Sequence, residues 1–159
     1  MWRYFKLSSA VLCLILFMCY TSFAGGLSTQ FVEVRLKGLR PGKSCSVKDK
    51  SGRELIIENT TDSKVVDIAV KAEKPVGYNL VPGYKPIPDL SWVVIDKDYF
   101  KDVGPGQSAK TDISIKIPND RKYAGKKYQV YLYSHTAGKE TMRMGLMSRL
   151  LLEVESVSK

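Results

Sequence analysis

The chain contains few of the residues from which enzymes and metal sites are built. Its 159 residues include one histidine, His135, and three cysteines. The patterns G-x-S-x-G, H-E-x-x-H, C-x-x-C and D-x-D-x-D-G are all absent. A catalytic nucleophile needs a base beside it, and a structural zinc site needs several nitrogen or sulfur ligands. The sequence therefore predicts no enzyme, no bound metal and no cofactor.

Long hydrophobic runs are also lacking, except at the start of the chain. Arg3 and Lys6 precede an apolar run over residues 10–20, and Ser22-Phe23-Ala24 forms a small-x-small cleavage site. The apolar run is shorter than the roughly 20 residues of a membrane-spanning helix. The pattern predicts a signal peptide over residues 1–24 and export to the periplasm or the extracellular space, the alternative being an uncleaved anchor.

Removal of that segment leaves a chain of ordinary single-domain size. We expect a flexible N-terminal segment over 25–30, one domain over 31–155 and a tail over 156–159, with no membrane span after signal cleavage. Two of the 25 Lys and Arg residues are removed with the signal peptide. The remaining chain has 23 basic and 16 acidic residues and therefore a net charge of +7. The basic residues are spread along the chain without interleaved stacking aromatics, and so no nucleic-acid partner is expected.

Cysteine is scarcer still after export. Cys13 and Cys19 lie in the signal segment, which leaves Cys45 alone. One cysteine cannot form an internal disulfide. Cys45 is therefore either a buried small hydrophobe or the site of a mixed disulfide with a partner chain.

The clearest pattern in the chain is strand alternation between Ser91 and His135. Pro105-Gly106 is a turn signal. After it, one side of an extended segment carries Thr111, Ile113, Ile115 and Ile117, while the intervening residues are polar or charged. Pro118 ends this strand, and alternation resumes from Tyr128. Period-two alternation of this kind predicts a sheet with one solvated face.

Further strands are expected on both sides of this stretch. The pattern predicts strands over 31–37, 54–58 and 66–72, the last two as a hairpin across the Asn59–Ser63 loop. Residues 141–154 predict a final strand whose apolar run at 150–152 is either buried on both sides or donated to another subunit. No segment shows a helical period. We therefore predict an all-β fold, a single immunoglobulin-like antiparallel β-sandwich of about 7–9 strands.

These motifs resemble a known group of domains. A strand followed by Asn59-Thr60-Thr61, a tryptophan strand, the Pro105-Gly106 turn and a strand ending in Ile117-Pro118 are similar to bacterial extracytoplasmic immunoglobulin-like or fibronectin III-like domains. They also resemble the first domain of periplasmic pilus chaperones. The chain departs from those chaperones because it has no room for a second domain and lacks a paired basic anchor for a subunit carboxylate. The resemblance implies a fold and no particular activity.

Two surfaces are candidates for binding. The first is the irregular loop over 75–91, whose four prolines exclude a central strand, with Tyr78, Tyr84 and the adjacent Trp92 available to a sugar or a peptide. The alternative places Trp92 in the core between the sheets and packs the two tyrosines onto it. The second surface is the strand face that carries Tyr131 and Tyr133, where we expect solvent or a docked partner.

The sequence thus favours a non-enzymatic exported module that joins another envelope or extracellular protein. The alternative is a carbohydrate- or peptide-binding module that uses loop 75–91. Asn59-Thr60-Thr61 is also a glycosylation sequon in a eukaryotic host, although it serves equally well as a turn.

Overall fold

The computed structural model describes residues 25–138 and 143–156, apart from the side chain of Tyr78. Within them the chain is almost entirely strand and turn. The strands are β1 (Leu27–Ser28), β2 (Glu33–Leu39), β3 (Ser44–Ser46), β4 (Leu55–Asn59), β5 (Val66–Glu73), β6 (Lys85–Pro86), β7 (Val93–Ile95), β8 (Tyr99–Val103), β9 (Ser108–Thr111), β10 (Ile113–Lys116), β11 (Lys127–Ala137) and β12 (Gly145–Val154). One α-helix, α2 (Val47–Ser51), and three 3-10 turns, η1 (Gly77–Asn79), η2 (Leu90–Trp92) and η3 (Arg121–Tyr123), complete the described elements.

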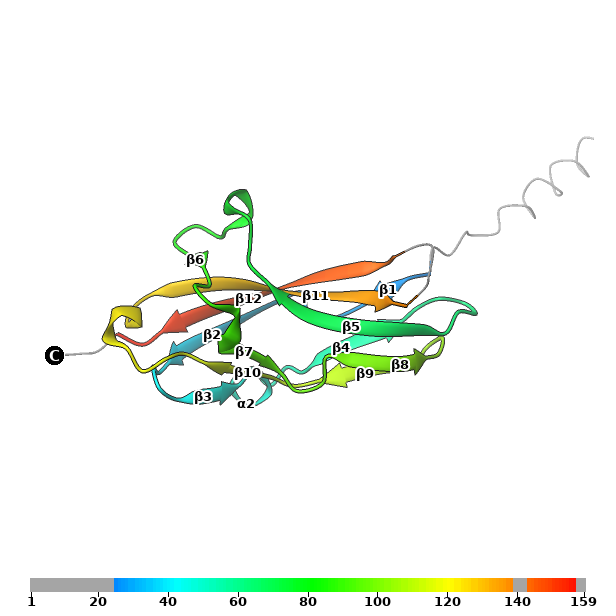
Figure 1. Cartoon of the computed structure of the whole chain (residues 1–159), viewed down its shortest axis with the longest axis horizontal. Coiled ribbons are helices and arrows are strands. Elements are labelled where there is room, and N and C mark those ends of the chain that lie inside the picture. Colours follow the sequence, from blue (N-terminus) through cyan, green and yellow to red (C-terminus); the bar gives the residue numbers. More distant parts are fainter. Residues whose placement is uncertain (1–24, 139–142, 157–159) are drawn as a thin grey trace, which may run out of the picture.

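The strands form two layers (Figure 1). One layer is a six-stranded sheet in the order β2-β12-β11-β5-β8, with the short β6 paired to β11. The other layer consists of two three-stranded sheets, β1-β4-β9 and β3-β10-β7. This arrangement confirms the predicted immunoglobulin-like β-sandwich.

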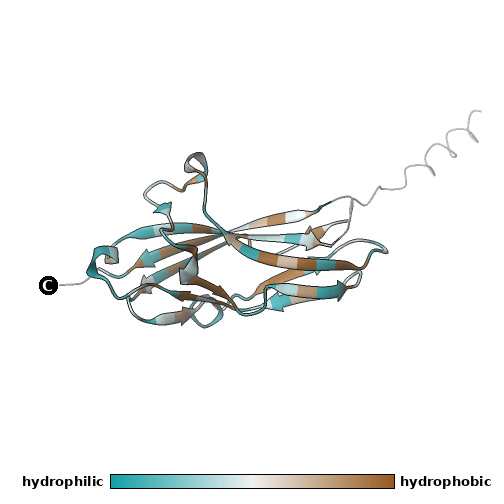
Figure 2. Cartoon of the chain, in the orientation of Figure 1, coloured by the Kyte–Doolittle hydropathy of each residue, from teal (hydrophilic) through white to brown (hydrophobic). Residues whose placement is uncertain are grey.

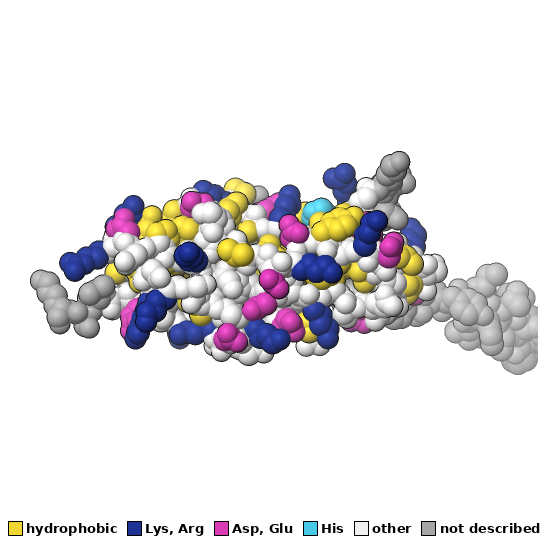
Figure 3. Space-filling model, turned by 60° about the horizontal axis from the view of Figure 1, so that its bottom comes forward, with side chains coloured by type: hydrophobic (Ala, Val, Ile, Leu, Met, Phe, Trp, Pro, Cys, Tyr) yellow, Lys and Arg dark blue, Asp and Glu magenta, His cyan; other side chains and the backbone are white. Residues whose placement is uncertain are grey.

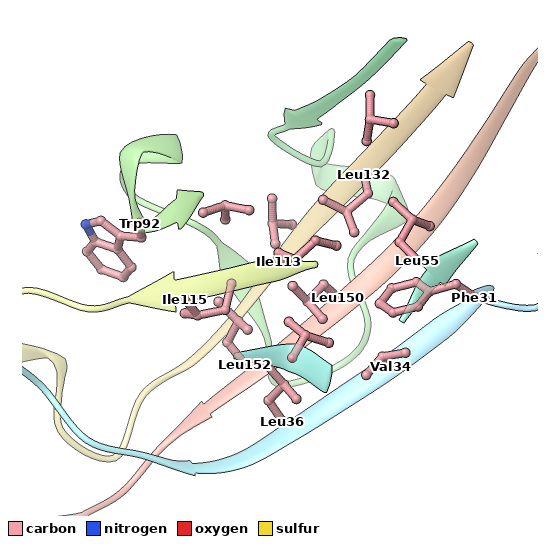
Figure 4. Packing of buried hydrophobic residues seen from close by; sticks show 14 of the residues in the cluster. Phe31, Val34, Leu36, Leu55, Trp92, Ile113, Ile115, Leu132, Leu150 and Leu152 are labelled. Atoms are coloured by element: carbon pink, nitrogen blue, oxygen red, sulfur yellow. The ribbon is translucent and has the colours of Figure 1, made fainter. Parts of the chain in front are cut away.

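The core lies between the layers and follows the alternation of the strands. Thr111, Ile113, Ile115 and Ile117 are each at most 3% exposed, as the period-two pattern predicts. Figure 4 shows Ile113 and Ile115 from one layer beside Leu150 and Leu152 from the other. Each fully buried aliphatic side chain contributes roughly 1.5–3 kcal/mol to folding relative to an exposed one. Figure 2 shows hydrophobic and hydrophilic residues alternating along these strands.

Three strand pairings differ from the prediction. Strands β4 and β5 do not form a hairpin, because β4 pairs with β1 and β9 while β5 belongs to the six-stranded sheet. The sandwich is also not wholly antiparallel, since β2 runs parallel to β12 and β6 runs parallel to β11. Alternation reports which side of a strand is buried but not which strand lies beside it, and so the sequence could not distinguish these pairings.

Two local features also differ. Residues 25–30, predicted as a flexible segment, include β1, which pairs with β4. Residues 47–51 form the short helix α2, although no helical period is evident in the sequence. The Ser46 side chain caps its first turn by accepting a hydrogen bond from Asp49 N, and Gly52 ends it in the left-handed conformation at φ 68°. No described helix has the length and apolar character of a membrane span.

Candidate functional site

The proline-rich loop lies on the outer face of the six-stranded sheet (Figure 1). We call residues 75–88 of it the strap. The buried Gln129 side chain of β11 holds the strap at two points, since its Oε1 accepts a hydrogen bond from Val81 N at 2.9 Å and its Nε2 donates to Asn79 O at 2.9 Å. The Tyr131 hydroxyl donates to the same Asn79 carbonyl at 3.1 Å. The two surfaces predicted as separate are therefore in contact, because one covers part of the other.

Tyr84 forms a third anchor of the strap. Its hydroxyl donates to Glu153 Oε1 of β12 at 2.6 Å, and the residue is 9% exposed. Burial, followed by this hydrogen bond, raises the pKa of Tyr84 to about 12. The same bond is the main cause of the lowered pKa of Glu153. Tyr84 thus packs the strap onto the sheet and does not project into solvent.

Trp92 lies in the core at the end of the loop. It is 3% exposed and makes edge-to-face contacts with Tyr123 and Tyr128, at centroid distances of 4.7 and 5.5 Å. Such aromatic pairs stabilise a fold by about 0.5–1.5 kcal/mol beyond the area they bury. Among the predicted site residues, the structure therefore places Trp92 and Tyr84 inside the molecule. The side chain of Tyr78 lies outside the described part.

The outer face of the sheet beyond the strap carries an accessible aromatic cluster. Tyr133 and His135, two residues apart on β11, stack with centroids 5.0 Å apart and planes at 29°. Lys71 of β5 and Met147 of β12 are the cross-strand neighbours of Tyr133. Lys71 Nζ lies 5.4 Å from the Tyr133 ring centroid, and Met147 is 52% exposed. We call these four residues the tyrosine platform.

Gly145 allows the Tyr133 ring to lie close to the backbone of β12. A Cβ atom on Gly145 would lie 2.6 Å from the Tyr133 hydroxyl and 2.7 Å from a carbon of its ring. The Tyr133 ring therefore lies directly over the Gly145 backbone, where any larger residue would displace it. Of the two tyrosines predicted on this face, Tyr131 is buried under the strap and Tyr133 remains accessible. Lys71 and Met147 were missed, because only the pairing of β5 and β12 with β11 brings them to Tyr133, whereas His135 shares its strand face with Tyr133 and could have been found from the alternation.

Ion pairs border the platform. Arg149 of β12 donates to Glu33 Oε2 at 2.9 Å and lies 6.0 Å from the ring centroid of Tyr131. A hydrogen bond with Tyr131 is the largest cause of the raised pKa of Arg149. Lys71 pairs with Glu73 at 2.8 Å. Both pairs are largely exposed, so each contributes at most about 1 kcal/mol to stability.

Asn59 of the sequon is fully buried. Its Nδ2 donates to Lys64 O and Val103 O, both at 2.8 Å, and its Oδ1 accepts from Thr61 N at 3.0 Å. The amide nitrogen that a glycan would occupy is thus bonded to two carbonyls. In the folded chain the triplet acts as a turn that carries the backbone from β4 in one layer toward β5 in the other.

Cys45 lies at the edge of the smaller layer, on β3. Its side chain is half-buried, and its thiol donates to Ser46 O at 3.5 Å. Burial is the largest cause of the raised pKa of this thiol. A raised pKa lowers the thiolate fraction and therefore the reactivity toward a disulfide.

The described residues hold no group of three or more His, Cys, Asp or Glu side chains that could bind a metal ion. The ring of His135 has its Nδ1 3.0 Å from the Thr136 carbonyl oxygen. Its stacking on Tyr133 places it in the platform.

No family model matches the sequence, and no curated protein matches it. Solved structures do resemble its fold. A PapD-like domain of human CEP192 superimposes with a TM-score of 0.56 at 11% identity, covering 84% of this chain and 87% of that domain. The periplasmic chaperone SfaE superimposes with a TM-score of 0.52 at 14% identity, and the match covers 84% of this chain and 61% of the chaperone. A protein of Bacteroides ovatus described as putative carbohydrate binding superimposes with a TM-score of 0.55 at 10% identity. The match covers 82% of this chain and 37% of that protein.

The two layers of this chain and its structural neighbours indicate the same architecture. At sequence identities of 10–14% this similarity supports a shared fold and nothing further. The chain spans about three fifths of the chaperone, which corresponds to the predicted resemblance to one domain of such proteins. This chain therefore has the immunoglobulin-like β-sandwich fold that its strand alternation and turn motifs predict.

Proposed function

We propose that this chain is an exported, non-catalytic module that binds another protein of the envelope or the extracellular space through the tyrosine platform. The observation that carries the proposal is the accessible stack of Tyr133 on His135 beside the half-exposed Met147. Tyrosine and methionine are enriched in protein interfaces, where an aromatic ring supplies contact area at low entropic cost.

The strap contributes to this surface by delimiting it. It bonds to Gln129 and Tyr131 on the outer side of the sheet, where the cross-strand neighbour of Gln129, Leu151, is also fully buried, and it ends the exposed area at Tyr133. A partner would therefore meet a shallow surface bordered by the strap and by the Arg149–Glu33 pair. Charge plays a smaller part beside the platform, because Lys71 pairs with Glu73 and Arg149 pairs with Glu33. Lys and Arg also lie interspersed with Asp and Glu on the different face that Figure 3 shows.

The alternative of glycan or peptide binding by loop 75–91 has less support. Its described tyrosine, Tyr84, is bonded to Glu153, and the loop tryptophan is in the core. The fold neighbour described as putative carbohydrate binding shares 10% identity with this chain. Among the described candidate aromatic residues, only the Tyr133 ring on the platform is available to stack on a sugar.

Site-specific photo-cross-linking in the native host tests the proposal. A photoreactive phenylalanine analogue replaces Met147 on the platform, and a control replaces Val94, which is also 52% exposed but lies in the opposite layer. We expect one discrete adduct from position 147 that position 94 does not give and that Tyr133→Ala reduces. Equal labelling from both positions, or none from 147, would refute the platform as the binding surface.

A further inference from the structure

The smaller layer has an incomplete edge where the chain leaves it. Strand β1 pairs with β4 at only two positions, Leu27 with Asn59 and Ser28 with Glu58. Continuing that register would place residue 30 opposite Ile56 and residue 32 opposite Glu54. The chain instead crosses to the other layer, where Arg149 N donates to Val32 O at 2.8 Å and β2 pairs with β12. In the described part of the chain, β4 therefore pairs with β9 on one side, but on the side of β1 no strand lies beside Ile56 or the preceding Glu54.

Backbone groups of β4 point into the vacant position. Asn59 bonds to the β9 side through Gln107 O and Gly106 N, whereas Thr60 N bonds to Gly26 O on the β1 side. The backbone N–H and C=O groups of successive residues in a strand point to opposite neighbouring strands. The N–H and C=O of Ile56 therefore point to the β1 side, as those of Thr60 do. The Thr29 hydroxyl donates to the Ile56 carbonyl at 2.6 Å, but among the described residues no strand faces the Ile56 N–H.

A groove of about 680 Å³ lies along this edge. Its walls are the departing chain and the outward side chains of β4 with the turn before it: Ser28, Thr29, Gln30, Phe31, Gly52, Arg53, Glu54, Ile56 and Glu58. Phe31 is 2% exposed and closes the core beneath it, at one end of the cluster in Figure 4. Ile56 is 37% exposed and supplies an apolar surface. The groove thus offers hydrogen bonds on one side and an apolar contact on its outer face.

Charge indicates the occupant. The groove has two carboxylates, Glu54 and Glu58, against one cation, Arg53, in a protein whose net charge after export would be +7. A second copy would meet this edge with its own β4, which carries no cation to face Glu54. Opposite charges on directly facing strand positions stabilise a pairing, and so a cation in an added strand is favoured opposite Glu54.

We propose that the β4 edge binds an extended segment of a protein partner by strand addition, with an apolar residue opposite Ile56 and a Lys or Arg opposite Glu54. The added strand accepts a hydrogen bond from the Ile56 N–H and completes the layer that β1 leaves short. This surface is separate from the tyrosine platform, because it belongs to the other layer. The two could engage different parts of one partner.

The test is a titration of the ¹⁵N-labelled chain, purified after export, with acetyl-Val-Thr-Lys-Thr-Lys-amide followed by NMR. The expected result is chemical-shift changes centred on Ile56 and Glu54, with slower hydrogen exchange of the Ile56 amide at saturation. The peptide acetyl-Val-Thr-Glu-Thr-Glu-amide should bind at least about five-fold more weakly. Equal binding of the two peptides, shifts centred elsewhere, or no binding would overturn the proposal.

Two variants and a control extend the test. Glu54→Lys should weaken binding of the lysine peptide about five-fold or more, since it breaks only the exposed Lys48–Glu54 pair within the fold. Ile56→Pro removes the unpaired N–H, a change that edge strands tolerate. Asp62→Lys makes the same charge change at an exposed position outside the groove and should leave binding unchanged. If sedimentation instead shows a dimer that Glu54→Lys dissociates, a second copy occupies the edge and the proposal fails.

Discussion

Replacing Asn59 tests how strongly one buried side chain connects the two layers. In Asn59→Ala, Thr61 N loses its acceptor and Val103 O loses a donor, while Lys64 O keeps the Thr61 hydroxyl at 2.8 Å. A buried polar group left without a partner costs about 1–3 kcal/mol. The loss of two such bonds should lower the free energy of unfolding by about 2–4 kcal/mol, a large share of a typical domain's stability.

The assay is urea unfolding at pH 7, followed by circular dichroism. The midpoint should fall without a change in slope, because the variant changes stability and not the surface exposed on unfolding. Asn59→Asp keeps the shape but places an ionised carboxylate against Lys64 O and Val103 O, and should lower stability at least as much. Asn119→Ala, at an exposed position, should change stability by less than about 0.5 kcal/mol. A loss below about 1 kcal/mol in Asn59→Ala would refute this account of the turn.

Three further predictions concern the strap and the start of the sandwich. Gln129→Ala should release the strap, and hydrogen exchange at the Val81 amide should quicken while the core amides stay protected. Gly25→Ala should destabilise the exported chain by about 1–3 kcal/mol in urea, because its Cβ would lie 2.7 Å from Thr61 Cα, and an unchanged midpoint would contradict the packing. The pKa of Tyr84 is raised from its ordinary 10 to about 12, so its contribution to stability is complete below pH 10 and lost as pH rises toward 12. Tyr84→Phe should show a smaller fall in unfolding free energy between pH 9 and 11.5 than the parent chain, and parallel curves would exclude the Tyr84 contribution.

The strap gives the six-stranded sheet two different outer surfaces. Near Gln129 the side chains on the outer face are inaccessible to solvent. Leu151 is fully buried there although it points away from the space between the layers. Near Tyr133 the same face is open. Covering one end of a sheet and leaving the other bare is consistent with a partner that binds the bare end. The vacant edge of β4 adds a second opening in the other layer.

The sequence alone determined the class of fold and the buried side of most strands. Residues 111–117 alternate because every second side chain of a strand points to the core, and this property is local. The predicted burial of residues 150–152 on both sides also holds, since all three are fully buried. Pro105-Gly106 marked a real turn, with Gly106 at φ 71°. Such signals depend on neighbours in the chain and can therefore be read without a structure.

Only the tertiary structure decided which surfaces remain free. Tyr131 and Tyr133 are equivalent in the alternation, but Tyr131 lies under Asn79, which is 52 positions away in the chain. The Asn59 triplet fitted a sequon and a turn equally well in the sequence, and only the structure places partners such as the Val103 carbonyl around the Asn59 side chain. The open edge at Ile56 arises because the chain crosses to β12 after Ser28, a pairing of segments more than a hundred residues apart. The free energy of such contacts depends on which strands meet, and residue patterns along one strand do not contain that information.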